Sequence, residues 1–192
     1  MAQVALSSGS VCRPYRSPWG AFPVKHMTPI SSGAQIYRGA VVTLDYTANS
    51  TNVGKIKTSS ANATFHTVGI AGAGSTMSTG VEPATIPVYE ANPSVEFVAN
   101  TKEQVSASSL IGMRKTLAWD STLNIAYVDL ADATAANLRV VVTGMNGVNG
   151  VTGLQGELGD SGAQVTFRFV TNLAGVGGST VVSSTPLLAF YS

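Results

Sequence analysis

Short runs of β-branched and aromatic residues recur along this chain from position 35 to position 170, separated by glycine, proline, asparagine and serine. Their spacing of roughly 8–12 residues is typical of an antiparallel β-sandwich or β-barrel. The clearest run is 163–170, AQVTFRFV, in which apolar and polar side chains alternate as in a strand with one buried face. Strands are predicted at 35–46, 55–58, 63–71, 84–90, 94–99, 113–119, 123–130, 137–144 and 163–170. The fold class is therefore all-β: a small antiparallel β-barrel or β-sandwich.

The first 34 residues differ from the rest, because a proline recurs every few positions among aromatic and basic residues. Proline lacks an N–H and biases the preceding residue towards extended backbone, which excludes a helix here. We therefore divide the chain into an extended N-terminal arm, 1–34, and a β domain, 35–192. The arm is expected to become ordered on another surface; packing against its own domain is the alternative. Its predicted contact residues are Arg13, Tyr15, Arg16, Trp19, Phe22 and Lys25.

A glycine-rich stretch, 144–162, carries glycine at every third position from Gly147 onward. A period of three is also the collagen signature, but the run is short and has no proline. A long surface loop is the better interpretation. Glycine lets two backbones approach closely, so this loop is the second predicted contact region. Its contact candidates are Gly147, Asn149, Gly150 and Gly153.

The chain is poor in charge. Only 11% of its 192 residues are charged, against about 25% in a typical soluble domain. A net charge of +1 argues against a general nucleic-acid binder. No apolar run reaches the ~18 residues of a spanning helix, and the start does not resemble a secretory signal. The single cysteine, Cys12, forms no internal disulfide, which suits synthesis in a reducing cytoplasm. A surface with so little charge is weakly protected against association, as expected for an assembly component.

The strongest catalytic motif is GDSGA at 159–163, which is similar to the GDSGG nucleophile loop of chymotrypsin-like serine proteases. His66, then Asp120 or Asp129, then Ser161 follow the protease order of His, Asp and Ser. However, an alanine replaces the last glycine of the motif, and His66 lies within a predicted strand. A protease is therefore the less favoured alternative, and we expect no enzyme. No third ligand accompanies the two histidines at metal spacing, so no metal and no cofactor are predicted.

Three segments resemble the capsid decoration (cement, auxiliary head) proteins of tailed bacteriophages. The central one is 87–144, from PVYEANPSVEFVA to NLRVVVTG, with an Asp at its hairpin turn and a VDL strand. IYRGAVVTLD at 36–45 and GDSGAQVTFRFV at 159–170 are similar to the first and last strands of that family. Together they cover most of 36–170. These motifs are patterns of size and polarity without a catalytic signature.

The resemblance implies a non-enzymatic virion structural protein that binds the outer capsid surface and cements neighbouring capsomers. Its partner would be the major capsid protein, with no nucleic acid and no membrane involved. It would act as a homo-oligomer, with a trimer favoured and a dimer possible, on the surface of a virion after synthesis in the host cytoplasm. A phage fibre or receptor-binding β protein is the alternative. A major shell-forming subunit is a further one, although the chain is short and poor in helix for that role.

Overall fold

The computed structural model describes residues 11–30, 35–45, 52–59, 67–75, 84–105, 110–132, 138–149 and 163–170. Within these ranges the chain forms eleven strands in two sheets and no α-helix, which confirms the all-β prediction. The strands are β1 (Arg13–Arg16), β2 (Val24–Met27), β3 (Val41–Leu44), β4 (Ile56–Thr58), β5 (Thr67–Ala71), β6 (Ile86–Glu90), β7 (Glu96–Thr101), β8 (Arg114–Asp120), β9 (Ile125–Asp129), β10 (Leu138–Asn149) and β11 (Ala163–Phe169).

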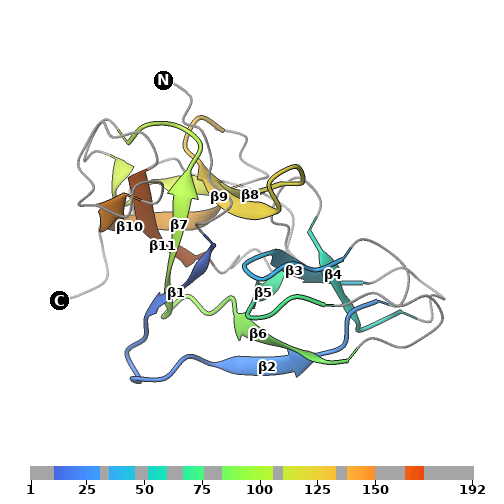
Figure 1. Cartoon of the computed structure of the whole chain (residues 1–192). Coiled ribbons are helices and arrows are strands. Elements are labelled where there is room, and N and C mark those ends of the chain that lie inside the picture. Colours follow the sequence, from blue (N-terminus) through green and yellow to red (C-terminus); the bar gives the residue numbers. More distant parts are fainter. Residues whose placement is uncertain are drawn as a thin grey trace, which may run out of the picture.

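Strands β7 to β11 form a closed barrel, which we call the C-terminal barrel (Figure 1). The sheet order is β1-β7-β11-β10-β8-β9, and β9 returns to pair with β7 in parallel, Asn100 opposite Tyr127 and Thr101 opposite Val128. Strand β1 pairs with the first half of β7, from Glu96 to Val98, on the same edge that β9 occupies further along. One edge of β7 is thus shared between β1 and β9.

Strands β2 to β6 form a second ring, the N-terminal barrel, in the order β2-β6-β5-β3-β4. The segment that follows β2 closes it, since Pro29 forms a parallel bridge with Ile56 of β4. Two backbone hydrogen bonds hold this closure: the N–H of Ile30 donates to the carbonyl of Ile56, and the N–H of Ile56 donates to the carbonyl of Thr28, each at 2.9 Å.

The two barrels share one topology. In each, the first strand pairs with the fifth, the fifth with the fourth, the fourth with the second and the second with the third. The third closes the ring in parallel, against the first strand in the C-terminal barrel and against Pro29, just after the first strand, in the N-terminal barrel. Closure pairs most strand edges of the two rings, while β1 remains an edge strand of the larger sheet in the described structure.

Alternating residues of the N-terminal barrel serve two cores. Val42 and Ala71 pack inside that barrel, with Ile36, Ile56, Ile86 and Val88. Their neighbours Val41 and Ile70 point the other way and join the core of the C-terminal barrel, beside Leu117, Phe97 and Phe167. Trp119, on β8, packs against both clusters. The two barrels therefore share buried apolar surface and form one body.

The N-terminal segment differs from the predicted free arm. In its described part, 11–30, β1 belongs to the sheet of the C-terminal barrel and β2 to the N-terminal barrel. The prolines stand where a missing N–H costs little. Pro14 is on an edge strand, Pro18 is in the turn after β1, Pro23 precedes β2 and Pro29 lies two residues after its end. The predicted single domain, 35–192, thus holds two barrels, one of which needs β2 from the arm.

The first part of the predicted glycine-rich loop, up to Asn149, is strand instead, because β10 covers Leu138–Asn149. Its extension pairs with β11, with Gly144 opposite Thr166 after a bulge and Asn149 opposite Ala163. A row of buried amides supports this pairing: Asn146 donates to Gln164 at 2.7 Å, and Gln164 donates to Asn100 of β7 at 3.1 Å. The rest of the predicted loop, 150–162, lies outside the described residues.

A buried carboxylate, Glu103, follows β7. Its side chain accepts the N–H of Leu130 at 2.8 Å and the residue is 4% exposed. Burial raises the pKa of the Glu103 carboxyl above its usual value, and the hydrogen bond from Leu130 acts in the opposite direction. The folded protein therefore holds this proton at a pH where the unfolded chain has lost it, so this group's contribution to stability falls as pH rises above about 4.3, the ordinary pKa of Glu.

We expect Glu103→Gln to flatten this part of the pH dependence and to stabilise the protein at pH 7, because the amide oxygen still accepts from Leu130 without a buried charge. Urea unfolding of both proteins at several values between pH 4 and pH 8 measures the effect. A wild type whose stability rises steadily over that range relative to the variant would contradict it.

Candidate functional site

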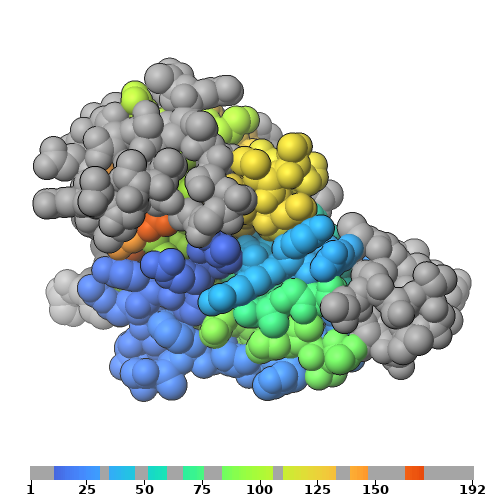
Figure 2. Space-filling model, in the orientation of Figure 1, coloured from blue at the N-terminus to red at the C-terminus, as the bar shows by residue number. Residues whose placement is uncertain are grey.

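Half of the large exposed apolar side chains of the described structure lie on the N-terminal segment. Three of the six large exposed ones are Tyr15 (42% exposed), Trp19 (59%) and Val24 (41%), within ten consecutive residues. Arg13, Arg16 and Lys25 are exposed on the same segment. Figure 2 shows this segment, in blue, at the surface of the molecule. We call these six residues the N-terminal face.

Trp19 is presented by a tight turn between β1 and β2. The N–H of Trp19 donates to the Ser17 hydroxyl oxygen at 3.3 Å, and Gly20 donates to the Ser17 carbonyl at 3.4 Å. Gly20 has φ +71°, a left-handed conformation that favours glycine. The turn orders the backbone at Trp19 and leaves its indole exposed to a partner.

Two of the three cations of this face are paired with carboxylates of the body. Lys25 Nζ lies 2.7 Å from Glu90, and Arg16 Nε lies 4.0 Å from Glu96. The Arg16 guanidinium also stands 5.5 Å from the centroid of the Tyr15 ring. Pairs with such exposed cations contribute at most about 1 kcal/mol each, so the cations remain available to a partner.

Phe22 is placed differently from the other predicted anchors. It is partly buried against the shared core, and its ring meets Tyr89 edge-to-face, with centroids 6.2 Å apart and an interplanar angle of 84°. It therefore packs the segment onto its own body. Phe22 is thus less exposed than Tyr15 and Trp19, and its role as an intermolecular anchor stays a prediction.

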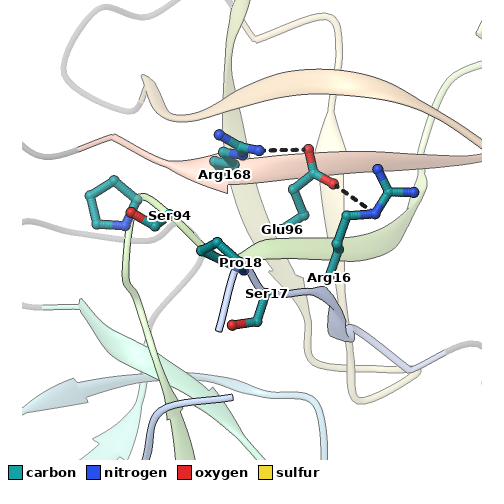
Figure 3. A pocket seen from close by; sticks show the side chains of 7 residues that line it. Arg16, Ser17, Pro18, Ser94, Glu96 and Arg168 are labelled. Carbon is teal, nitrogen blue, oxygen red and sulfur yellow. Dashed lines mark hydrogen bonds and ion pairs between the residues drawn. The ribbon is translucent and has the colours of Figure 1, made fainter. Parts of the chain in front are cut away.

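A hollow of about 340 Å³ lies beside the turn that carries Trp19 (Figure 3). We call it the arginine pocket. Its lining comes from the end of β1 and the following turn, the β6–β7 turn, β7 and β11: Arg16, Ser17, Pro18, Pro93, Ser94, Glu96 and Arg168. Two arginines far apart in sequence thus converge on one carboxylate.

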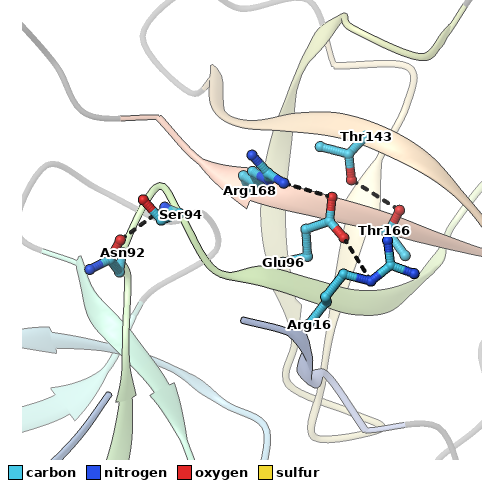
Figure 4. Close-up of polar contacts among 7 residues, drawn as sticks. All are labelled: Arg16, Asn92, Ser94, Glu96, Thr143, Thr166 and Arg168. Atoms are coloured by element: carbon cyan, nitrogen blue, oxygen red, sulfur yellow. Dashed lines mark hydrogen bonds and ion pairs between the residues drawn. The ribbon is translucent and has the colours of Figure 1, made fainter. Parts of the chain in front are cut away.

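Hydrogen bonds hold the walls of this pocket (Figure 4). Arg168 donates to Glu96 at 3.1 Å, and the N–H of Ser94 donates to the Asn92 side chain at 2.9 Å. On the strands behind, Thr143 donates to Thr166 at 3.0 Å. Arg168 Nε is buried and, among the residues described, has no hydrogen-bond acceptor. The pocket therefore combines two guanidinium groups with one carboxylate, and its formal charge is net positive.

Of the protease-like residues considered in the sequence, the structure describes only the two aspartates, Asp120 and Asp129. His66 and Ser161 lie outside the described residues, as do Gly150 and Gly153. Both carboxylates cap local turns: Asp120 accepts from Thr122 and Leu123, and Asp129 accepts from Ala131 and Asp132. Gly147 and Asn149 lie in β10 rather than in a loop.

Other chemical features are few in the described ranges. No three His, Cys, Asp or Glu residues are grouped there as metal ligands. None of the described segments is a helix with the length and apolar character needed to cross a bilayer. Cys12 is buried in the shared core, and burial raises the pKa of its thiol far above the usual value. A protonated, inaccessible thiol is unreactive.

Sequence reasoning missed Ser94, Glu96 and Arg168 as site residues. Alternation in 163–170 had placed Arg168 on the polar face of its strand, but its position opposite Glu96 depends on the pairing of β11 with β7, 72 residues apart.

Comparison of the chain with protein-family models, curated protein sequences and solved structures gives no match.

Proposed function

We propose that this chain is a structural protein of a virion, bound to the outer surface of the capsid, where it cements neighbouring capsomers. The observation that carries the proposal is the N-terminal face, where Tyr15 and Trp19 are exposed beside three cations on a segment fixed to a closed double barrel. Aromatic and arginine side chains supply much of the binding energy of protein interfaces. The family resemblance of 36–170 supplies the capsid as the partner.

The architecture supports a binding role through side chains. Closure of both barrels pairs most strand edges of the described residues, which limits recognition by strand addition to edges such as that of β1. The N-terminal face joins the two barrels, because β1 belongs to one and β2 to the other. Load applied at this face is therefore shared by both barrels, which suits a clamp on a shell under internal pressure.

The proposed partner is the major capsid protein, and the proposed assembly is a homo-oligomer, with a trimer favoured over a dimer. Many weak contacts on a repeating lattice give tight attachment through effective concentration. A surface with 11% charged residues suits such close neighbours. The described chemistry assigns no catalytic step, and a non-enzymatic role is part of the proposal.

We expect the double variant Tyr15→Ala/Trp19→Ala to lose at least ~30-fold in affinity for capsids, since interface hot spots of this kind are worth about 2 kcal/mol or more. Folding should be unaffected, because both side chains are exposed. Capsids made without the protein are mixed with the full recombinant chain, and bound protein is measured by co-sedimentation.

The matched control is Tyr37→Ala, which removes an exposed aromatic outside the N-terminal face. It should rebind like the wild type. Wild-type protein that does not bind such capsids, or a double variant that binds as well as Tyr37→Ala, would refute the proposal. Binding to host cells instead of capsids would favour the fibre or receptor-binding alternative.

A further inference from the structure

We infer that the arginine pocket binds the carboxylate of an aspartate or glutamate side chain presented by the partner protein. This inference rests on the proposed function for the identity of that partner. The pocket itself is a feature of this chain alone, formed by the turn after β1, the β6–β7 turn, β7 and β11.

The charge balance of the pocket favours a monoanion. Arg16 and Arg168 bring two positive charges, and Glu96 brings one negative charge, which leaves a net charge of +1. Only one nitrogen of Arg168 reaches Glu96 within 3.5 Å, and Arg16 approaches it at 4.0 Å. Most of the N–H groups of the two guanidiniums therefore lie beyond hydrogen-bond reach of this carboxylate.

The hydrogen-bonding groups are also mainly donors. The Arg16 and Arg168 side chains are 71% and 41% exposed, and a guanidinium group carries only N–H donors. Ser17 uses its hydroxyl oxygen to accept from Trp19, which leaves its hydroxyl hydrogen for another acceptor. A carboxylate accepts only, and it matches guanidinium groups in geometry.

The size and walls of the pocket point to one side chain rather than to a long polyanion. About 340 Å³ is near the lower limit of ligand pockets, which is roughly 300 Å³. Pro18 and Pro93 form stiff walls, because the proline ring fixes φ.

The test is a titration of the full ¹⁵N-labelled chain with blocked peptides, followed by NMR. The probe is acetyl-Gly-Glu-Gly-amide, and acetyl-Gly-Gln-Gly-amide is its neutral match. We expect the glutamate peptide alone to shift the side-chain Nε–H signals of Arg16 and Arg168, with saturation at millimolar concentration. The shifts should weaken at least threefold between 20 and 500 mM NaCl. Equal shifts with both peptides, or none with either, would overturn the inference.

Two further probes separate the possible sources of the anion. Acetyl-Gly-Gln-Gly with a free carboxyl end tests a chain terminus, and inorganic phosphate tests a phosphate group. The inference expects both to bind at least fivefold more weakly than the glutamate peptide. Tighter binding of either would overturn the assignment to an acidic side chain.

Arg168→Gln should weaken glutamate-peptide binding at least tenfold, whereas Arg38→Gln, at an exposed arginine outside the pocket, should leave it unchanged. Arg168→Lys, which keeps the charge, is the second variant if the glutamine variant does not fold; it should weaken binding at least threefold, because lysine lacks the planar fork. Unchanged binding in the folded variant would overturn the inference. These titrations contain no capsids, so their failure is distinct from a failure of capsid rebinding.

Discussion

Phe97→Ala is expected to lower the free energy of unfolding by about 3–5 kcal/mol, the usual cost of deleting a buried phenylalanine side chain. Phe97 is fully buried on β7 and forms an aromatic cluster with two residues of β11. Its ring stacks on Phe167 at 5.8 Å and meets Phe169 edge-to-face at 5.2 Å. Truncation removes both ring contacts and leaves a cavity that rigid strands cannot fill.

The loss should reach both barrels. Val41 and Ile70 of the N-terminal barrel belong to the same apolar cluster as Phe97, and Trp119 contacts the cores of both barrels. Urea unfolding of Phe97→Ala, followed by far-ultraviolet circular dichroism and by tryptophan fluorescence, should therefore show one shared transition. Its midpoint urea concentration should be lower than that of the wild type.

Tyr15→Ala is the control for Phe97→Ala, because it removes an aromatic side chain that is 42% exposed. Its effect should stay within about 0.5 kcal/mol. Two separate transitions in Phe97→Ala, with one unchanged, would show that the barrels unfold independently and would contradict the shared core. A loss equal to that of Tyr15→Ala would contradict the cluster itself.

Local patterns predicted the strands well. In 163–169, Val165, Phe167 and Phe169 lie in the shared core, as their alternation indicates. The hairpin of β8 and β9 is confirmed, and Asp120 caps its turn by accepting from Thr122 and Leu123. Such features depend on residues near in sequence, whose side-chain period and turn chemistry are directly visible.

Long-range pairing was not predictable in the same way. Closure of each ring joins strands that are not sequence neighbours, through Asn100 with Tyr127 in one barrel and Pro29 with Ile56 in the other. No local signal specifies these parallel contacts. The N-terminal segment was predicted incompletely for the same reason. Its prolines correctly indicated extended backbone, but no local signal indicated that β1 pairs with β7 and β2 with β6.

This correction changes how the N-terminal segment can be tested. Deletion of 1–30 would remove β2 and the closing residue Pro29 from the N-terminal barrel, so a loss of binding would report unfolding. Point substitutions at Tyr15 and Trp19 avoid the problem, because these exposed side chains contribute little to the core. The candidate site was thus predictable in part. The aromatic and basic residues of the N-terminal segment could be identified from the sequence, whereas the pocket around Glu96 and Arg168 could be found only from the fold.

Gly69→Ala is expected to destabilise the N-terminal barrel by about 3 kcal/mol or more, at the upper end of overpacking effects. Gly69 lies in β5, between Val42 of β3 and Glu90 of β6. A Cβ atom at this position would stand 1.9 Å from the carbonyl oxygen of Tyr89 and 2.8 Å from its carbonyl carbon. These are backbone atoms of a paired strand, so no side-chain rotation relieves the clash. Thermal unfolding followed by circular dichroism measures the loss.

Gly144→Ala is the matched control, since it also adds a methyl group to a glycine within a strand. Here the nearest atom is the Thr166 hydroxyl oxygen at 3.2 Å, at the end of a side chain that can adjust. The expected cost is below about 1 kcal/mol. Equal melting temperatures for the two variants would mean that β5 and β6 do not approach as closely as the ring of the N-terminal barrel requires. Because β2 pairs with β6 beside this contact, a large effect of Gly69→Ala should also disturb the strand that carries Val24 and Lys25, and with it one end of the N-terminal face.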